Sequence, residues 1–491
     1  MEGKTLYYCD HQYGSGKTTA WLMHCAERSR LINQCVVYPT LNLLNQKLRQ
    51  FRGLVSRDVE VRAITSECSK RVINDLLEHL NGSGTARRRV LFITYQAWLE
   101  LPHIHHAEEW EFCFDDCATT PFVDLSRKLA DQHHLLTDLL EPVDPHAEFS
   151  RLRVRDGKAG RLERVAVNED GDEALDVISK VTRAMMRPEA WVGVWCRVDN
   201  WLKVAAGADA ARTDGERDQR RKLFLQGEIN PERFTRAART TFLRTRWTGT
   251  LMCLNASRNH AIRFMPHPHV RPAGIPYRGQ GLNILHYQKP IFSKHNRDQE
   301  VADGPTRFEQ FKRHVEAVHA GEPYGVVMNN DKRSAGVTFS SAETIPPECA
   351  GQEDFAELTS IAAPIALRYS ACMMAFLQHR GIRQAEANDD LYAEGIAQII
   401  MRSAARRQGF NGEVTAHVMD EWVANRLLDR FPLATTQHIP DILTPVTRAK
   451  RPNASRPGRR RKHASGAERT RACRARKRAA ALAAQGARTA T

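Results

Sequence analysis

Short apolar, β-prone runs alternate with longer amphipathic stretches at the start of the chain. The runs at residues 5–9, 34–38, 90–93 and 112–114 are short and bounded by polar or turn residues, as buried strands are. The stretches between them have the apolar spacing and start signals of helices. Alternating strands and helices predict a parallel sheet covered by helices.

The loop after the first predicted strand is rich in small residues and runs directly into a predicted helix. It contains Gly14, Ser15, Gly16, Lys17, Thr18 and Thr19. A strand, a glycine loop, Gly-Lys-Thr and a helix together form the phosphate-binding P-loop, although His11 stands where its first glycine is expected. The glycines aim backbone N–H groups inward, and the helix dipole adds attraction for polyphosphate. We expect Lys17 to contact the β- and γ-phosphates, and the Thr18 hydroxyl to ligate Mg²⁺.

Polar residues also follow the other predicted strands. Thr40 comes after the second strand, Thr94 ends the third, and Asp115 and Asp116 follow the fourth. In a parallel α/β sheet, ligands bind at the carboxyl ends of the strands. These side chains are therefore expected to lie near Lys17.

In this order the segments resemble the motifs of a superfamily-two helicase of the DExD/H-box type. Residues 14–19 resemble motif I, the spaced set Pro39, Thr40, Leu43 and Gln46 resembles motif Ia, and Thr94 resembles motif Ib. Asp115 and Asp116 stand where the DExx box belongs, with aspartate in place of the family's glutamate. The resemblance implies that Asp115 holds Mg²⁺ and that Asp116 orients the attacking water. It also implies that Pro39, Thr40, Gln46 and Thr94 line a nucleic-acid groove.

A second α/β unit is predicted over residues 261–440. A helix at 307–319 leads into a strand resembling motif IV at 324–330, and residues 349–355 are a weak match to motif V. Gln398, Arg402 and Arg406 resemble motif VI, and their spacing of four would place them on one face of a helix. The resemblance implies that Arg402 or Arg406 reaches ATP across a cleft between two domains, with Gln398 beside it.

The first domain is predicted to span residues 1–260 with a long interruption. Residues 120–245 are polar, and we expect them to form a mostly helical insertion. The coupling segment of the family, motif III, is then expected as a strand over residues 250–257.

The net charge of +15 is concentrated in the C-terminal segment, residues 441–491. Residues 447–491 contain 15 of the 72 Lys and Arg residues and one acidic residue, Glu468, which gives +14 there and +1 elsewhere. Such a tail is expected to be disordered and to contact nucleic-acid phosphates without reading sequence. The residues expected to do so are Arg459, Arg460, Arg461, Lys462, Arg474 and Arg478.

Composition excludes several other classes of protein. The chain has no apolar run of about 18 residues, as a transmembrane helix requires, and its first residues have no signal-peptide pattern. The 11 cysteines are scattered and complete no zinc site, which is typical of a reduced, cytoplasmic protein.

The sequence therefore predicts an α/β fold of two RecA-like parallel-sheet domains with a helical insertion and a disordered basic tail. The function expected from the resemblance is an ATP- and Mg²⁺-dependent helicase or translocase on nucleic acid. DNA is favoured over RNA, in the replication of a phage or plasmid. Two alternatives stay open. A DNA-packaging motor of the terminase type would need an acidic nuclease cluster, for which only Asp389 and Asp390 are candidates. A DNA-binding adaptor with a degenerate ATPase would account for His11, Asp116 and the basic tail.

Overall fold

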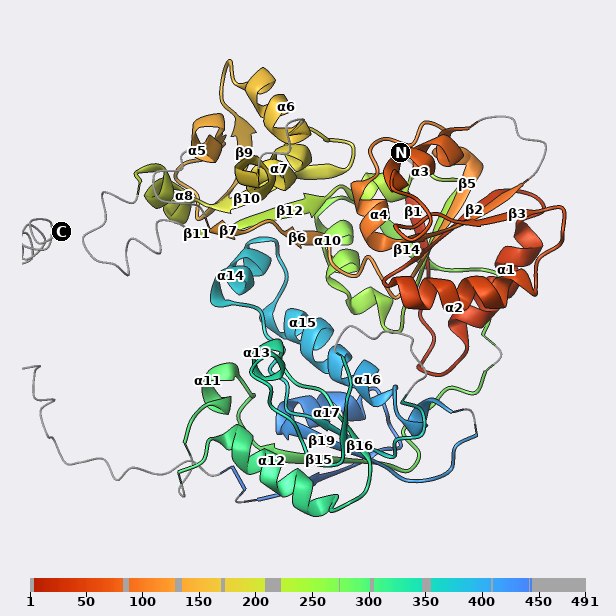
Figure 1. The fold of residues 1–491 in the computed structure, drawn as a ribbon, viewed down its shortest axis with the longest axis vertical. Helices are drawn as coiled ribbons and strands as arrows, with labels where there is room; N and C mark the ends of the chain where they lie inside the picture. The colour runs from red at the N-terminus through yellow and green to blue at the C-terminus, as the bar shows by residue number, and fades with distance from the viewer. Residues whose placement is uncertain are drawn as a thin grey trace, which may run out of the picture.

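The computed structural model describes residues 4–82, 88–128, 135–168, 173–207, 222–272, 274–300, 304–346, 355–407, 409–440 and 442–443. These residues form three units (Figure 1). A parallel-sheet domain lies at the upper right of the view, the insertion lies beside it at the upper left, and a second parallel-sheet domain lies below both. The expected basic tail, residues 441–491, is outside the described residues except for 442–443.

The first domain is built on a seven-stranded sheet in which every neighbouring pair of strands is parallel. The strand order is β14-β1-β13-β5-β2-β4-β3. The strands are β1 (Thr5–Cys9), β2 (Asn33–Tyr38), β3 (Glu60–Ala63), β4 (Arg89–Thr94), β5 (Trp110–Asp115), β13 (Arg239–Leu243) and β14 (Arg263–Pro266).

Helices cover both faces of this sheet. They are α1 (Lys17–Arg28), α2 (Leu41–Arg52), α3 (Val72–Asn81), α4 (Tyr95–Glu100) and α10 (Leu251–Asn259), with short turns η1 (Ala107–Glu109), η3 (Pro231–Phe234) and η4 (Trp247–Gly249). Because side chains alternate along a strand, Val36 and Tyr38 pack with α1 and α2, whereas Cys35 and Val37 pack with α3, α4 and α10. The continuous apolar runs of the sequence are thus strands buried on both faces.

The strand predicted over residues 250–257 is wrong, since this segment belongs to helix α10. Thr250 caps the helix, and its Oγ1 accepts a hydrogen bond of 3.2 Å from the backbone N–H of Cys253. The strand that follows the insertion is instead β13, which lies between β1 and β5 in the sheet. The residues after β13 therefore lie beside the P-loop.

The insertion contains the predicted helices, but they pack with an antiparallel sheet that was not predicted. Its strands are β6 (Phe122–Asp124), β8 (Leu140–Pro142), β9 (Phe149–Val154), β10 (Trp191–Arg197) and β12 (Leu225–Ile229), in the order β6-β12-β10-β9-β8. A further pair joins β7 (Arg127–Lys128) to β11 (Lys222–Leu223), and the helices are α5 (Leu135–Leu139), α6 (Ala159–Val167), α7 (Glu173–Met185) and α8 (Val198–Ala205). Strand β9 shows why the pattern looked polar: exposed Arg151 and Arg153 flank buried Leu152. The strand that follows, β13, belongs to the sheet of the first domain, so residues 239–243 lie outside the insertion.

The second domain is a six-stranded sheet that is also parallel throughout, in the order β17-β16-β18-β19-β15-β20. Its strands are β15 (Leu282–Gln288), β16 (Tyr324–Val326), β17 (Ala342–Thr344), β18 (Ser360–Ala363), β19 (Val414–Asp420) and β20 (Thr435–His438). Its helices are α11 (Lys294–Arg297), α12 (Arg307–Val318), α13 (Asn330–Ser334), α14 (Ala371–His379), α15 (Gln384–Asn388), η5 (Asp389–Ala393), α16 (Glu394–Ile400), η6 (Ala404–Arg406) and α17 (Glu421–Leu428). The prediction of an α/β fold with two RecA-like domains is confirmed.

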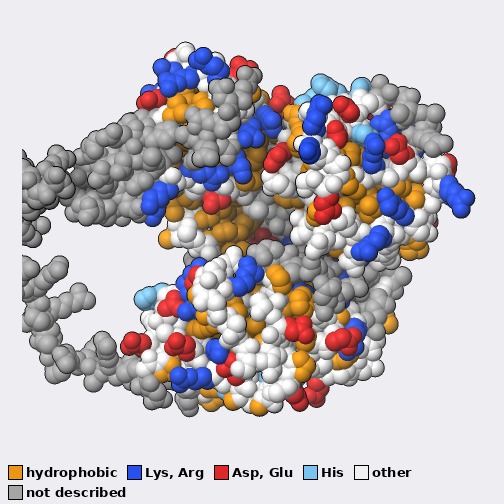
Figure 2. Space-filling view, viewed as in Figure 1, with side chains coloured by type: hydrophobic (Ala, Val, Ile, Leu, Met, Phe, Trp, Pro, Cys, Tyr) orange, Lys and Arg blue, Asp and Glu red, His pale blue; other side chains and the backbone are white. Residues whose placement is uncertain are grey.

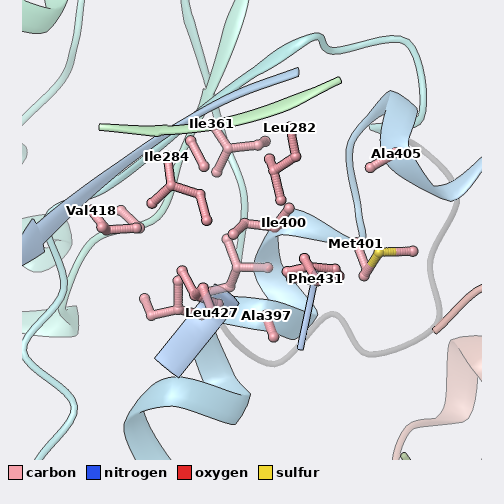
Figure 3. Packing of buried hydrophobic residues seen from close by; sticks show 14 of the residues in the cluster. Leu282, Ile284, Ile361, Ala397, Ile400, Met401, Ala405, Val418, Leu427 and Phe431 are labelled. Carbon is pink, nitrogen blue, oxygen red and sulfur yellow. The ribbon is translucent and has the colours of Figure 1, made fainter. Parts of the chain in front are cut away.

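One core of the second domain joins the sheet to the helices that face the first domain. Ile284, Ile361 and Val418 of three adjacent strands pack with Ile400 of α16 and Leu427 of α17 (Figure 3). Met401 and Ala405, which follow α16, are also buried in this cluster. The segment carrying the motif VI-like residues is therefore fixed to the sheet by its apolar side chains.

Helix α14 leaves the second domain and packs on the insertion. Its Phe376 is buried against Phe149 and Trp195, with ring centroids 5.5 and 6.0 Å away. At the left of the view the molecule is hollowed between the insertion and the second domain, and side chains of several kinds, Lys and Arg among them, border the hollow (Figure 2). Among the described residues, no helix combines the length and apolar character that crossing a bilayer requires.

Candidate functional site

The P-loop has the backbone conformation that its two glycines predict. Gly14 and Gly16 have φ angles of 69° and 79°, in the left-handed region that residues with a side chain rarely adopt. Gly16 is also the N-cap of α1, so the N–H groups of the first helical turn face the loop. Backbone N–H groups of the chain after β14 hold the loop from outside: Gly274 donates to the Ser15 carbonyl at 3.1 Å, and Tyr277 to that of Tyr13 at 3.0 Å.

Lys17 is held by three oxygens at the mouth of this loop. Its Nζ donates to the carbonyls of His11 at 2.8 Å and Gln12 at 3.2 Å, and to Thr245 Oγ1 at 2.7 Å. Thr245 in turn donates to the His11 carbonyl at 3.0 Å. Burial lowers the pKa of Lys17 from its usual value. His11, the departure from the P-loop pattern, thus takes part in the loop through its backbone carbonyl.

Asp115 lies opposite Thr18, at the carboxyl end of β5. Thr18 Oγ1 donates a hydrogen bond of 2.9 Å to Asp115 Oδ2. Burial raises the pKa of Asp115 to about 7, and the neighbouring carboxylate of Asp116 acts in the same direction. A buried carboxyl group beside a second carboxylate and a hydroxyl is an oxygen-rich site of the kind that suits Mg²⁺, which is usually bound by one or two protein ligands together with phosphate oxygens.

Asp116 has an unusual backbone conformation for a residue with a side chain. Its φ is 51°, and its N–H donates to the Leu243 carbonyl of β13 at 2.9 Å. The Arg244 guanidinium lies 3.6 Å from Asp116 Oδ1. Left-handed residues of this kind are strained and persist where neighbouring structure determines them. Strand β13 therefore sets the orientation of Asp116.

Residues of the second domain form the opposite wall of the same pocket. The pocket has a volume of about 300 Å³ and is lined by Tyr13, Gly14, Gly16, Lys17, Thr18, Thr19, Leu43, Lys47, Asp115, Asp116, Thr245, Gln398, Met401, Arg402 and Arg406. The structure thus brings residues predicted from motifs I, II and VI into one cleft between the two domains.

The predicted single helix through Gln398, Arg402 and Arg406 is wrong, although all three residues reach the pocket. Helix α16 ends at Ile400, Arg402 lies in a turn, and Arg406 ends the short helix η6. The Ser403 hydroxyl accepts a hydrogen bond of 3.3 Å from the backbone N–H of Ala405 and so caps η6. The cap starts a separate short helix, so α16 does not continue through Arg406. Buried Arg402 donates to the Pro346 carbonyl at 2.6 Å, and Gln398 donates to Glu394 at 3.4 Å.

Three of the four residues expected to line a nucleic-acid groove, Pro39, Thr40 and Thr94, lie at the ends of β2 and β4. Thr94 pairs in register with Tyr38, which places it beside Pro39 and Thr40. Both threonines cap the helices that follow: Thr40 Oγ1 accepts from Leu43 at 3.4 Å and Thr94 Oγ1 from Ala97 at 3.3 Å. Gln46 is half-buried on α2. The basic residues of the tail, from Arg459 to Arg478, and most of the motif V segment are outside the described residues.

Sequence reasoning missed several residues in or beside the pocket, among them Tyr13, Thr245, Arg244 and Glu394. Tyr13 lies inside the P-loop, and its hydroxyl donates to Glu394 Oε2 of the second domain at 2.6 Å. Arg244 and Thr245 directly follow β13, a β-branched and apolar strand after the insertion. Polar residues directly after a β-prone run were the signal that could have located Arg244 and Thr245. The same rule, that ligands bind at the carboxyl ends of parallel strands, located Asp115.

Comparisons with known proteins return solved structures alone, since no family model and no curated protein matches this chain. A helicase structure named XPD is 11% identical with a TM-score of 0.42, covering 89% of this chain and 96% of the other. Dbp5 of S. cerevisiae, bound to RNA and ADP BeF3, is 10% identical with a TM-score of 0.36, covering 89% and 85%. The DEAD-box helicase Mss116, bound to ssRNA and UDP-BeF, is 10% identical with a TM-score of 0.34, covering 89% and 72%. These solved structures are of helicases. The motif order of this chain resembles the same class.

Proposed function

We propose that this chain hydrolyses ATP in the cleft between its two RecA-like domains and uses the cycle to move along nucleic acid, as a helicase or translocase. The observation that supports it is the composition of one pocket: the P-loop, Asp115 and Asp116 come from the first domain, and Gln398, Arg402 and Arg406 from the second. A site built from both domains binds nucleotide best when the domains are close together. Hydrolysis then changes how they sit against each other.

Each group in the pocket has a role that its position and chemistry suit. The P-loop amides and Lys17 bind the phosphates, and Asp116 orients the attacking water. Arg402 or Arg406 stabilises the charge that develops on the transferred phosphoryl group, with Gln398 beside it. Thr18 and Asp115 are the residues that would hold Mg²⁺, which neutralises phosphate charge when bound.

Nucleic acid is the substrate along which the two domains would move. Pro39, Thr40 and Thr94 lie together at the ends of β2 and β4, on the first domain. Their contact with a strand would link that strand to the sheet that carries the P-loop. We expect DNA to be favoured over RNA, with the basic tail adding contacts to phosphates.

The acidic pair that motivated a DNA-packaging nuclease has other partners. Asp389 pairs with Arg430 at 3.1 Å and Arg246 at 3.5 Å, and Asp390 accepts from the Leu251 N–H at 3.2 Å. The contacts with Arg246 and Leu251 join the second domain to the first. These partners favour a role for Asp389 and Asp390 in the domain interface over one in metal-dependent cleavage of DNA.

ATP turnover measured with and without single-stranded DNA and RNA of equal length tests the proposal. We expect nucleic acid to stimulate turnover, DNA more than RNA. Displacement of a labelled strand from a partial duplex distinguishes a helicase from a translocase. ATP turnover that neither DNA nor RNA changes would contradict movement along nucleic acid. A complete absence of ATP turnover would favour the DNA-binding adaptor.

A further inference from the structure

A second pocket lies next to the P-loop, on the far side of the first turn of α1. Its volume is about 480 Å³, and α1 and the chain that follows β14 form its two walls. It shares Gly16 and Thr19 with the pocket in the cleft. The two pockets therefore meet at the helix turn that is proposed to hold the phosphates.

The wall that follows β14 is held by the same loop and strand that build the P-loop. The His267 N–H donates to the Tyr8 carbonyl at 2.7 Å, and His267 Nδ1 accepts from the N–H groups of His269 at 3.2 Å and Val270 at 3.0 Å. Val270 is buried against the core under α1. A few residues later, the Gly274 N–H donates to the Ser15 carbonyl. The wall is thus positioned independently of any ligand.

Two imidazole rings face this pocket from its two walls. His24 comes from α1 and His269 from the chain after β14, and both line the pocket. Their ring centroids are 6.3 Å apart and their planes differ by 19°. Burial lowers the pKa of His24, so at neutral pH its ring is an uncharged flat surface. Nucleobases stack on such aromatic faces.

We propose that the purine base of the bound nucleotide occupies this pocket against His24 and His269, while its phosphates lie on the P-loop. The inference rests on the proposed function and adds how the base is recognised. A phosphate chain bound at the first turn of α1 leads past Thr19, which belongs to both pockets, so the sugar and base pass into the second one. The acidic and basic side chains of the pocket, Glu27 and Arg271, are exposed at its rim. Stacking uses the flat face of the base, whereas adenine and guanine differ in the hydrogen-bonding groups on their edges. ATP and GTP therefore bind with affinities within about ten-fold of each other.

Binding of ATP, GTP and inorganic tripolyphosphate to the full chain, measured by calorimetry with Mg²⁺ present, tests this assignment. ATP binds about five-fold or more tightly than tripolyphosphate, because one base stacked on an aromatic side chain contributes at least that much. His24→Ala and His269→Ala each weaken ATP binding several-fold and leave tripolyphosphate binding unchanged. His269→Phe, which keeps a flat ring, retains the affinity for ATP. His105→Ala is the matched control, since this exposed histidine lies in the loop before β5, at the other end of the strands.

The outcomes separate this inference from the proposed function. Equal affinities of the wild-type chain for ATP and tripolyphosphate, or histidine variants that weaken both ligands alike, would overturn the base pocket while leaving the P-loop as a phosphate site. GTP binding more than about ten-fold weaker than ATP would overturn recognition by stacking alone. Failure of the wild-type chain to bind either triphosphate would overturn both proposals.

Discussion

The hydroxyl of Tyr13, inside the P-loop, donates a hydrogen bond of 2.6 Å to the carboxylate of Glu394, at the start of α16 in the second domain. Both side chains are buried. Glu394 also accepts from Gln398 at 3.4 Å and from Arg430 at 3.4 Å. Gln398, which lines the opposite wall of the pocket, belongs to this polar cluster around Glu394. A change in the P-loop on nucleotide binding would therefore act directly on the cluster.

Tyr13→Phe should loosen this connection. The change leaves a buried carboxylate oxygen without one of its donors, at a cost of about 1–3 kcal/mol, and we expect a lower melting temperature and a weaker stimulation of turnover by nucleic acid. Tyr324→Phe is the control, because the buried hydroxyl of Tyr324 has no hydrogen-bond partner in the described part of the chain. A Tyr13 variant that melts and turns over like the Tyr324 variant would show that the contact does not couple the domains.

Changes at Asp116 test its assignment as the residue that orients water. Asp116→Glu should maintain or raise ATP turnover, because it restores the reach of the family's glutamate at the same backbone position. Asp116→Ala should reduce turnover while ATP still binds, since the phosphates are held elsewhere in the pocket. Single-turnover hydrolysis and ATP titration measure the two effects. Equal losses of turnover in both variants would mean that this loop is not the DExx box.

Arg406 is the better candidate for the group that stabilises the transition state, since it is half-buried at the pocket, whereas Arg402 is buried in the domain. Arg406→Ala should lose turnover by about 10³-fold or more with little change in ATP affinity, as expected for an arginine finger. Arg402→Ala should also lower the melting temperature. Arg407→Ala is a matched control one residue away, where the side chain pairs with Glu357 at 2.7 Å. Normal turnover in both the Arg402 and Arg406 variants would contradict a site shared by two domains.

A buried histidine chain in the second domain makes stability depend on pH. His417 is joined to Tyr287 at 2.5 Å and to His319 at 2.9 Å, and His319 to Ser360 at 2.9 Å, with His314 nearby. Burial lowers the pKa of His417 to about 3. Below pH 6.5 the imidazole of His417 therefore binds fewer protons in the folded protein than in the unfolded chain. His417 costs no stability above that pH, and the free energy of unfolding decreases as the pH falls from 6.5 toward 3.

This pH dependence can be measured as the melting temperature of the wild-type chain and of His417→Asn between pH 7.5 and pH 5. The wild-type chain should lose about 2 kcal/mol of stability over this range through His417 alone, which the variant should not. Parallel losses in the two proteins would mean that His417 does not contribute.

Local signals were sufficient to predict much of the site. The P-loop, Thr40 and Asp115 each lie at or just beyond the carboxyl end of a strand. In a parallel sheet these strand ends share one edge, so the residues come together whatever the length of the connecting segments. Thr245 was missed because the insertion separates β13 from β5 and removes any local spacing. The Tyr13–Glu394 contact joins residues 381 positions apart, which no periodicity reveals.

The errors have physical causes of the same kind. The spacing of Gln398, Arg402 and Arg406 suits a helix, but the Ser403 side chain offers a competing cap that ends it. Residues 250–257 are apolar enough for a strand, yet Thr250 starts a helix. In the insertion, buried and exposed residues alternate along β9, but the exposed arginines made the segment look uniformly polar, so the strand was not predicted.

The most direct test of the account is ATP turnover by Lys17→Ala. The Lys17 ammonium stands at the mouth of the P-loop and lines the pocket that both domains share. We predict at least a hundred-fold loss of turnover, about the cost of removing one preorganised donor from a transition state, with an unchanged melting temperature. Lys70→Ala, at an exposed position away from the pocket, should retain full activity. Wild-type turnover by a folded Lys17→Ala protein would contradict the claim that this cleft is the site of ATP hydrolysis.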